Sequence, residues 1–478
     1  MSAPGEQRST GADSGVTPGQ QPRAEAGDPL PRRRLVFGIV SMALFMSSID
    51  QTIVASALPA IQHELGSQVN WSGWTITIYA LGQVLTMPVA GKISDQFGRK
   101  KVFLSAAVLF TTASLLCGFA SSIGVLVALR AAQSLGGGAF MPSATGIVSD
   151  HFGRDRDRAV GMFTSILPVG GIVGPILGGV FVAAWSWRGI FLVNVPIGVL
   201  LIVLSAVFIP QGSTRDTGRT DVRGIALLGV LILAAMFGIT YLGSGAVAFD
   251  DPVFLGSEAV AVVAAVLFVR HVKRHDAPFI PYRLLRGKGF GVMNVINLVY
   301  GAAALGFGAL VPLYAEDRFG MGSLQGGTLL TARAFGVVVV AALAAMALRR
   351  TGYRMPMLVG FAVLAAGLAL MSLTPHWMPA YAWLAVAAAI TGLGMGVSVP
   401  ASNNASLQLA PDQVAAIAGL RGMFRQAGGI MAISVTTAVV ARSAAPGAAL
   451  ADVFMVVAVL VVATIPMVFA VPDHHSGW

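Results

Sequence analysis

Charged residues are scarce in this sequence of 478 residues: Asp, Glu, Lys and Arg make up 11% of it, against about 25% in ordinary soluble domains. Cys117 is the only cysteine and lies in an apolar run, which excludes an intrachain disulfide and a thiolate metal cluster. The seven histidines fall in predicted loops or in a tail, and no HExxH or other metal-binding spacing occurs. No GxxxxGK(S/T) phosphate-binding loop exists, so the sequence predicts neither a metal site nor drive by ATP hydrolysis.

Apolar residues are correspondingly abundant in the sequence. They make up 55% of the chain, and the mean hydropathy is +0.77. Fourteen apolar runs of roughly 20 residues follow Arg34, each long enough to cross a hydrocarbon layer of about 30 Å. We therefore predict an all-α polytopic membrane protein. The predicted spans are 35–58, 73–93, 101–120, 124–148, 159–183, 187–209, 222–243, 253–271, 289–315, 325–348, 355–374, 380–402, 413–440 and 449–471.

The positive charge of the chain is spread rather than concentrated. The formal net charge is +10 and the pI is near 10.2, but the basic residues form no single patch, which argues against a nucleic-acid partner. Of the 31 Lys and Arg residues, 24 fall on the side of the N-terminus, and only Arg188, Arg318 and Arg442 fall on the other. By the positive-inside rule, we expect a multi-pass protein of the cell membrane with both termini in the cytoplasm.

The order of spans and polar stretches predicts the domain organisation. Residues 1–34 are rich in Gly, Pro, Ser and Gln and are expected to form a disordered cytoplasmic tail rather than a signal peptide. Six-helix bundles are expected over 35–209 and 289–471, with two inserted helices and basic linkers between them over 210–288. Residues 472–478 form a second cytoplasmic tail. Transporters are commonly built from two repeated halves with the substrate site between them.

One short string joins the second and third spans: Gly91-Lys-Ile-Ser-Asp95-Gln-Phe-Gly98-Arg99-Lys100-Lys101. Gly91 permits close helix contact, Gly98 allows a tight turn, and Asp95 stands beside the basic cluster that Arg99 and Lys100 begin. The string resembles the signature loop of the major facilitator superfamily in spacing, predicted side and position. We expect it to act as a conformational elbow in which Asp95 biases the conformational equilibrium rather than touching substrate.

Three further strings narrow the resemblance. They are Phe45-Met-Ser-Ser-Ile-Asp50-Gln-Thr-Ile-Val54, Leu129-Arg130-Ala-Ala-Gln133-Ser-Leu-Gly136-Gly137 and Gly170-Gly171-Ile-Val-Gly174-Pro175-Ile-Leu-Gly178-Gly179. Together with fourteen spans, this set is similar to the fourteen-helix drug:proton antiporter family. The resemblance implies a major facilitator fold of two six-helix bundles plus two inserted central helices. It also implies export of a hydrophobic compound in exchange for protons, without a cofactor.

Asp50 is the only acid deep within the first six spans. At 1.5 Å per residue it lies about 12 Å below the predicted outer end of its span, and Arg130 of the fourth span lies about 9 Å below the same surface. At matched depth the two can neutralise each other, and an intramembrane charge without a partner is unfavourable. Burial disfavours an ionised carboxylate and a nearby arginine favours it, so we predict a proton-coupling pair. The alternative is a static structural ion pair.

The fifth span carries small residues at four-residue spacing, and these allow close helix packing in lipid. In the resembled family this glycine–proline string marks antiporters. The residues concerned are Gly170, Gly174, Pro175, Gly178 and Gly179.

Polar residues on single helix faces are expected either to line the substrate cavity or to hydrogen bond between helices. The candidates are Tyr79, Gln83, Asn294, Asn297, Tyr300, Arg333, Asn403, Arg421 and Arg425. An arginine near mid-membrane facing lipid is unfavourable by about 2.5 kcal/mol or more. If Arg333 or Arg421 lines the cavity, an acidic or neutral, oxygen-rich substrate is favoured over a cation. The alternative is that both bond to helix carbonyls or to residues such as Asn294 and Asn297.

These observations predict a proton-driven exporter of antibiotic-like or toxic small molecules that works by alternating access. Its partners are the small-molecule substrate, protons and the lipid bilayer, and the sequence is compatible with a monomer. The closest alternative is a proton-coupled symporter or facilitator for a small organic solute. A sensor should carry a soluble signalling domain and an enzyme a nucleophile or metal cluster. Neither is visible in the sequence, so no catalytic residue is predicted.

Overall fold

The structure, a computed structural model, describes most of the chain between the two predicted tails. Residues 1–29 and 472–478, and with them most of the tail predictions, lie outside the described residues. The described residues are 30–67, 69–152, 155–164, 166–211, 221–243, 247–275, 278, 280–287, 289–374, 377–410, 413–440 and 442–471.

Helices occupy all fourteen predicted spans. The N-terminal part contains α1 (Leu30–Glu64), α2 (Val69–Phe97), α3 (Arg99–Gly118), α4 (Ile123–Phe152), α5 (Arg156–Thr164), α6 (Ile166–Ala184), α7 (Gly189–Leu192) and α8 (Asn194–Phe208). The inserted pair is α9 (Val222–Leu242) and α10 (Pro252–Arg274), followed by the short α11 (Tyr282–Arg286). The C-terminal part contains α12 (Phe290–Gly301), the π-helical segment η2 (Ala302–Gly306), α13 (Phe307–Phe319), α14 (Ser323–Thr351), α15 (Arg354–Ser372), α16 (Ala380–Gln408), α17 (Val414–Val440), α18 (Pro446–Thr464) and the 3₁₀ segment η4 (Pro466–Ala470).

Fewer than fourteen spans are found when each described helix is assessed separately for its length and apolar composition. Among the described residues, eleven helices are long and apolar enough to cross a membrane, or twelve if the bent pair around η2 is one span. The two predicted spans that are not among them contain α14 and the pair α5 and α6, whose apolar part over Val169–Ala184 is short. The fold is all-helical as predicted, and the count of fourteen spans stays a prediction.

Two predicted spans are divided into more than one helix by described residues. The span 187–209 is shared by α7 and α8, which begins two residues before Pro196. Proline has no backbone N–H to donate, so helices commonly break near it. In the span 289–315 the chain bends by 50° between Phe290–Gly306, which ends in η2, and Leu310–Phe319. A π-helical turn changes the hydrogen-bond register and is a usual cause of such a kink.

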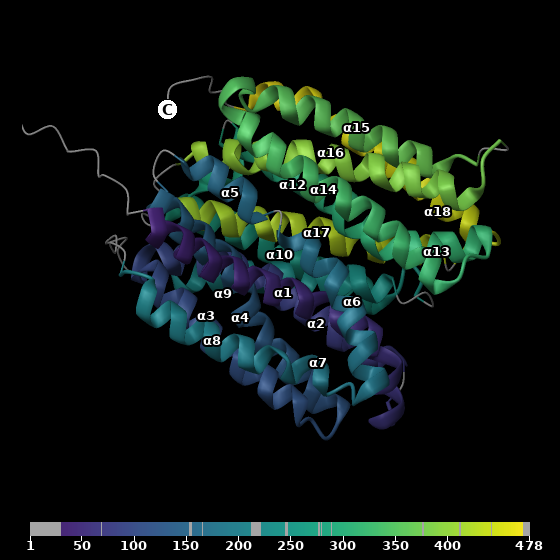
Figure 1. Cartoon of the computed structure of the whole chain (residues 1–478), viewed down its shortest axis with the longest axis horizontal. Helices are drawn as coiled ribbons and strands as arrows, with labels where there is room; N and C mark the ends of the chain where they lie inside the picture. Colours follow the sequence, from purple (N-terminus) through teal and green to yellow (C-terminus); the bar gives the residue numbers. More distant parts are fainter. Residues whose placement is uncertain are drawn as a thin grey trace, which may run out of the picture.

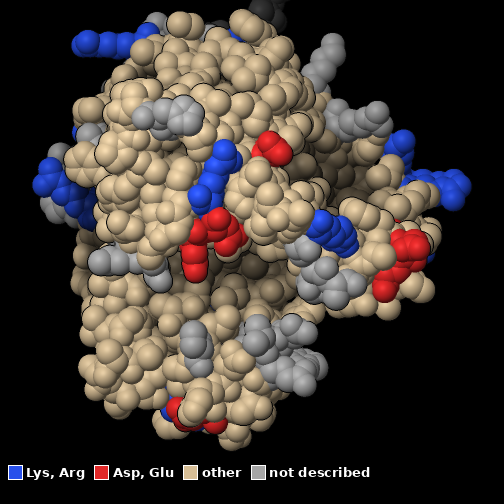
Figure 2. Space-filling model, turned by 90° about the vertical axis from the view of Figure 1, so that its right-hand side faces the viewer, with Lys and Arg blue, Asp and Glu red and all other residues tan. Residues whose placement is uncertain are grey.

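The helices run side by side, with the N-terminal part below and the C-terminal part above in Figure 1. The chain alternates between two faces, and one face carries the end of α2, the start of α3 and the end of α10, where basic residues gather. We call it the basic face; it lies at the left of Figure 1. The opposite face is hollowed between the upper and lower parts (Figure 2).

Two large apolar clusters hold this arrangement together. One fills the N-terminal part and includes Phe103, Phe110 and Phe140 from α3 and α4. It continues into the inserted pair, through Phe268 of α10, and into the start of α17. The second fills the C-terminal part. The first cluster therefore joins α17 to the N-terminal helices at the basic face, which fixes the position of the elbow described below.

Candidate functional site

Asp50 lies in the interior of α1 and is fully buried. Its Oδ2 accepts a hydrogen bond from Arg130 Nη1 of α4 at 2.6 Å. Its Oδ1 accepts from Gln133 Nε2 of the same helix at 2.9 Å and from Asn194 Nδ2 at the start of α8 at 3.0 Å. Three helices therefore converge on one carboxylate, and both of its oxygens are hydrogen bonded.

A second layer of hydrogen bonds fixes these donors. The Ser114 hydroxyl of α3 accepts from Gln133 Nε2 at 3.1 Å and from Asn194 Nδ2 at 3.2 Å. The same hydroxyl donates to the carbonyl of Phe191 in α7 at 3.0 Å. Gln133 Oε1 in turn accepts from Arg130 Nη1 at 2.7 Å. Because each donor is held by another group, the amides cannot turn away from Asp50 without breaking further bonds.

Arg130 is as deeply buried as the acid, with 1% of its side chain exposed. Its Nε donates to the carbonyl of Thr75 in α2 at 3.2 Å. Its guanidinium carbon lies 4.0 Å from the ring centroid of Tyr79, also in α2, in a cation–π contact. Such a contact stabilises a desolvated cation by about 2 kcal/mol. The positive charge thus has an anion, a carbonyl and an aromatic face around it.

The ion pair of Asp50 and Arg130 is closed off from solvent. A buried ion pair is tolerated only with its partners in place, because an unpaired charge in a low-dielectric interior is strongly unfavourable. Asp50 has no exposed surface in this state. The structure brings the predicted pair into direct contact, and its role in proton coupling stays a prediction.

The glycines of α6 pack against the same helix that carries Asp50. A Cβ at Gly174 would stand 2.1 Å from Thr52 Oγ1, and one at Gly178 would stand 2.0 Å from Ser56 Oγ, both in α1. Gly170 faces Ser48 one turn earlier in the same way. Two rows with four-residue spacing therefore interlock, as small residues do between membrane helices.

The neighbouring glycine of this string behaves differently. A Cβ at Gly179 would meet no heavy atom within 4 Å in the part of the chain that the structure describes. Gly179 therefore lies outside the closely packed row of Gly170, Gly174 and Gly178. The link of this string to antiport stays a prediction.

The predicted elbow is a cluster of charges and backbone groups at the basic face. Gly98, with a φ of 102°, separates α2 from α3, and glycine adopts this φ without strain. Arg99 Nη2 lies 3.4 Å from Asp95 Oδ1. The Nη1 of Arg99 contacts the carboxylate of Asp150 and the carbonyl of Gly146, both in α4. The elbow is therefore anchored to the N-terminal part.

The same elbow touches the C-terminal part. Asp95 Oδ2 accepts a hydrogen bond from the backbone N–H of Ala416 at 3.1 Å, in the first turn of α17. The first N–H groups of a helix have no partner within it and carry a partial positive charge, which a carboxylate stabilises. Gly91 allows the approach, because a Cβ there would stand 2.4 Å from the carbonyl oxygen of Ala415. One carboxylate thus ties α2 to α17 and closes the basic face at this point.

A cluster of arginines lies in the C-terminal part. Arg333 of α14 is half-buried, and its Nη2 donates to the carbonyl of Ala304 in η2 at 2.6 Å, beside the bend of that span. Arg421 and Arg425 of α17 are also half-buried. All three lie within Coulombic reach of Tyr300, whose buried hydroxyl has no hydrogen-bond partner among the described residues. We call these four residues the arginine cluster.

Two asparagines contact the arginine cluster. Arg421 Nη2 lies 3.4 Å from Asn297 Oδ1 and also contacts Asn403 Oδ1 of α16. Both asparagines are buried. Arg333 and Arg421 therefore make the hydrogen bonds to a helix carbonyl and to asparagine side chains that are the alternative to lining the cavity. Part of the surface of each arginine nevertheless stays exposed.

The remaining cavity candidates are buried between helices. Asn294 Nδ2 donates to the carbonyls of Leu284 and Leu285, at 3.2 and 3.4 Å, and so holds α11 against α12. Gln83 is 4% exposed and accepts from Gln51 of α1 at 3.4 Å. Tyr79 covers Arg130, as described above. In this state these three side chains pack between helices instead of facing open space.

Gln133, Asn194 and Ser114 are site residues that the sequence alone does not single out. For Gln133 a signal exists, because it follows Arg130 by three residues and so shares its face of α4. Asn194 and Ser114 belong to α8 and α3, and only the packing of the helices brings them to Asp50.

The bundle of long apolar helices with a buried polar centre is the architecture of a membrane transporter. The sequence profile of the Major Facilitator Superfamily matches residues 40–433. The match covers most of the chain, so the chain belongs to the Major Facilitator Superfamily.

Individual relatives and one solved structure agree with this assignment. The chain is 28% identical over 430 residues to the multidrug transporter protein MdtP of Bacillus subtilis (strain 168), covering 88% of this chain and 77% of the relative. It is 25% identical over 386 residues to the riboflavin transporter RibZ of Clostridioides difficile (strain 630), covering 80% and 83%. The crystal structure of the human organic anion transporter MFSD10 (TETRAN) shares the fold, with a TM-score of 0.67 and 16% identity over 92% of this chain and 100% of that one.

Replacing Arg130 by alanine should destabilise the protein strongly, because it leaves the buried Asp50 charge without its counter-ion. We expect a loss of about 3–5 kcal/mol, seen as a lower midpoint of thermal unfolding in detergent. Adding Asp50→Asn should restore part of the loss, since neither charge then remains. Arg188→Ala is the matched control: it breaks a partly exposed ion pair with Glu64, worth up to about 1 kcal/mol. Equal losses in Arg130→Ala and Arg188→Ala would contradict the expectation.

Proposed function

We propose that this chain is a proton-coupled antiporter of the cell membrane that exports antibiotic-like or toxic hydrophobic small molecules. The observation that carries the proposal is the fully buried Asp50 carboxylate, held by Arg130, Gln133 and Asn194. The likeness to a multidrug transporter supports the class of substrate. The basic face is cytoplasmic in this proposal, with both termini on that side, as the distribution of Lys and Arg favours.

The arrangement of the two faces supports transport by alternating access. The basic face is tied by Asp95 and α17, and the opposite face is hollowed (Figure 2). In this state the Asp50 carboxylate accepts hydrogen bonds from Arg130, Gln133 and Asn194. Protonation removes the charge that attracts Arg130, so it weakens the contact between α1 and α4. Proton uptake and release at Asp50 thereby favour different states of the transporter, which is what coupling requires.

Import of a small organic solute is the second candidate. It is favoured by the likeness to a riboflavin transporter, at 25% identity. The glycine–proline string of α6 favours export instead. The direction of substrate movement under an imposed pH gradient separates the two: an antiporter moves substrate against the proton flow, and a symporter moves it with the proton flow.

Asp50→Asn should abolish export driven by a pH gradient in proteoliposomes. Asparagine keeps most of the shape and accepts hydrogen bonds through Oδ1, but it does not titrate. Because it leaves the buried Arg130 without its counter-ion, the amount of folded, inserted protein is measured beside transport, and the transport rate is expressed per folded molecule. Asp452→Asn, an exposed acid on α18, is the matched control and should transport at the wild-type rate. Full gradient-driven transport by Asp50→Asn would remove Asp50 from the coupling mechanism.

Asp95→Asn should shift the conformational equilibrium without changing substrate affinity. It removes the negative charge from the N-terminus of α17, an interaction worth about 0.3–2 kcal/mol. We expect a several-fold increase in the population open at the basic face, measured by distances between spin labels on α2 and α17, together with a changed turnover number. Asp150→Asn removes the other acid that contacts Arg99 and should have a smaller effect. A large loss of equilibrium substrate binding with unchanged populations would contradict this.

The arginine cluster should set the charge selectivity. With three arginines around Tyr300, a desolvated anion finds a counter-charge and a lipophilic cation is repelled. We expect efflux of anionic or neutral, oxygen-rich compounds to exceed that of cations of similar size, and Arg333→Ala and Arg421→Ala to reduce the anion preference at least several-fold. The measurement is a vesicle-transport panel that pairs the two classes. Strong transport of cations by the wild type, unaffected by either substitution, would exclude this role.

A further inference from the structure

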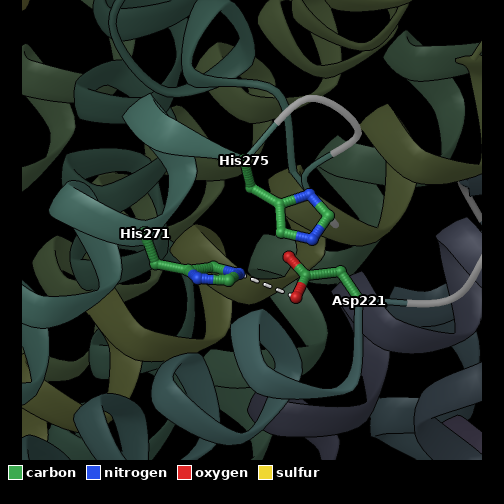
Figure 3. A group of neighbouring side chains, drawn as sticks. All are labelled: Asp221, His271 and His275. Carbon is green, nitrogen blue, oxygen red and sulfur yellow. Dashed lines mark hydrogen bonds and ion pairs between the residues drawn. The ribbon is translucent and has the colours of Figure 1, made fainter.

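A cluster of metal-ligating side chains lies at the basic face, away from the transport site. Asp221 immediately precedes α9, His271 stands in the last turn of α10, and His275 caps that helix. Figure 3 shows both imidazole rings turned toward the carboxylate of Asp221. The nitrogen and oxygen ligand atoms of the three residues all lie within 4.8 Å of one another. Nothing in the transport mechanism uses these residues.

The helix, rather than the loop expected from the sequence, produces this grouping. The predicted span ends at 271, which leaves His275 in a linker, whereas α10 continues to Arg274. The backbone N–H of His275 donates to the carbonyl of His271 at 2.9 Å, so the last turn includes both. Two residues four positions apart lie on one helix face. The spacing is that of a histidine pair on one helix, and the third ligand comes from the neighbouring helix.

The distances suit one metal ion with little rearrangement. His271 Nε2 lies 2.8 Å from Asp221 Oδ1. Ligand atoms at 2.0–2.2 Å from a tetrahedral zinc ion stand about 3.3–3.6 Å apart, so this pair opens by about 0.5–0.8 Å. The other two pairs both involve His275 and lie within 4.8 Å, so they close by about 1.5 Å at most for such bonds. His275 is exposed at the end of its helix, so rotation of its side chain can supply that movement.

Charge at this place also favours a cation. The C-terminal end of a helix carries a partial negative charge, which here belongs to α10. Asp221 adds a full negative charge, and its Oδ1 already accepts a hydrogen bond from the N–H of Gly224 at 2.8 Å as the N-cap of α9. A carboxylate has about four lone-pair positions, so it can cap a helix and bind a metal at once. Among the basic residues near the site in sequence, which are Arg223, Arg270, Lys273 and Arg274, Lys273 has its Nζ 5.0 Å from the ring centroid of Tyr282.

We propose that Asp221, His271 and His275 form a binding site for a divalent transition-metal ion. Two imidazole nitrogens and one carboxylate oxygen suit zinc and its neighbours better than magnesium or calcium, which prefer oxygen ligands alone. Water completes the coordination. When the ion binds, it replaces the hydrogen bond between His271 and Asp221 and cross-links α9 to α10 at the membrane surface. The role of the ion is structural: it stabilises the contact between the two inserted helices and takes no part in transport.

The test is titration of the purified full chain with Zn²⁺ in detergent, followed by calorimetry, after removal of any affinity tag. His474→Ala and His475→Ala are present in every sample, because the two tail histidines can bind metal themselves. Co²⁺ is used in a parallel titration, since nitrogen ligands in a site of low coordination number give it a visible absorption that the hydrated ion lacks. We expect one equivalent of Zn²⁺ per chain and a visible Co²⁺ spectrum.

Matched variants decide the assignment. His275→Ala changes an exposed side chain and should lower zinc affinity by at least about tenfold, as should His271→Ala. Asp221→Asn keeps an equally good N-cap and should weaken binding without disturbing α9. His63→Ala, an exposed histidine at the opposite face, should leave affinity unchanged. If no zinc binds once the tail histidines are replaced, or if His271→Ala and His275→Ala bind as the wild type does, the site does not exist.

Discussion

The structure depends on the burial of one ion pair in a region with no water to stabilise it. Asp50 and Arg130 are both 1% exposed or less, and each charge in such a place requires the other. Their mutual attraction alone does not satisfy all of their hydrogen-bonding atoms, so the amides of Gln133 and Asn194 and the hydroxyl of Ser114 complete the shell. The surrounding helices therefore have to meet at one point.

That requirement makes the N-terminal helices a single mechanical unit. The polar centre takes side chains from α1, α3, α4 and α8, and backbone or aromatic groups from α2 and α7. The row of hydroxyl-bearing residues on α1, interlocked with the glycines of α6, adds α6 to this group. Movement within this group would expose unpaired polar atoms. In the proposed mechanism, alternating access therefore takes place at the boundary between this group and the C-terminal helices.

Much of this could be predicted from the sequence, for definite physical reasons. The apolar runs fix the class of fold, because nothing but a helix satisfies the backbone in lipid over 20 residues. The depths of Asp50 and Arg130 follow from the rise of a helix, so their contact could be anticipated. What could not be anticipated depends on tertiary packing. Asn194 and Ser114 approach Asp50 only after folding. The bend next to η2 depends on the neighbours of α12 and α13. His275 lies beside His271 only because α10 continues beyond its apolar segment.

The contact between Asp95 and the start of α17 is weak enough to be reversible. A carboxylate at a helix N-terminus contributes about 0.3–2 kcal/mol. Moving one elementary charge through a membrane potential of 100 mV is worth about 2.3 kcal/mol. The two energies are of the same order, so in the proposed mechanism the movement of one charge per cycle offsets the loss of this contact. Separating a buried, still charged pair such as Asp50 and Arg130 would cost about 3–5 kcal/mol, more than that movement supplies.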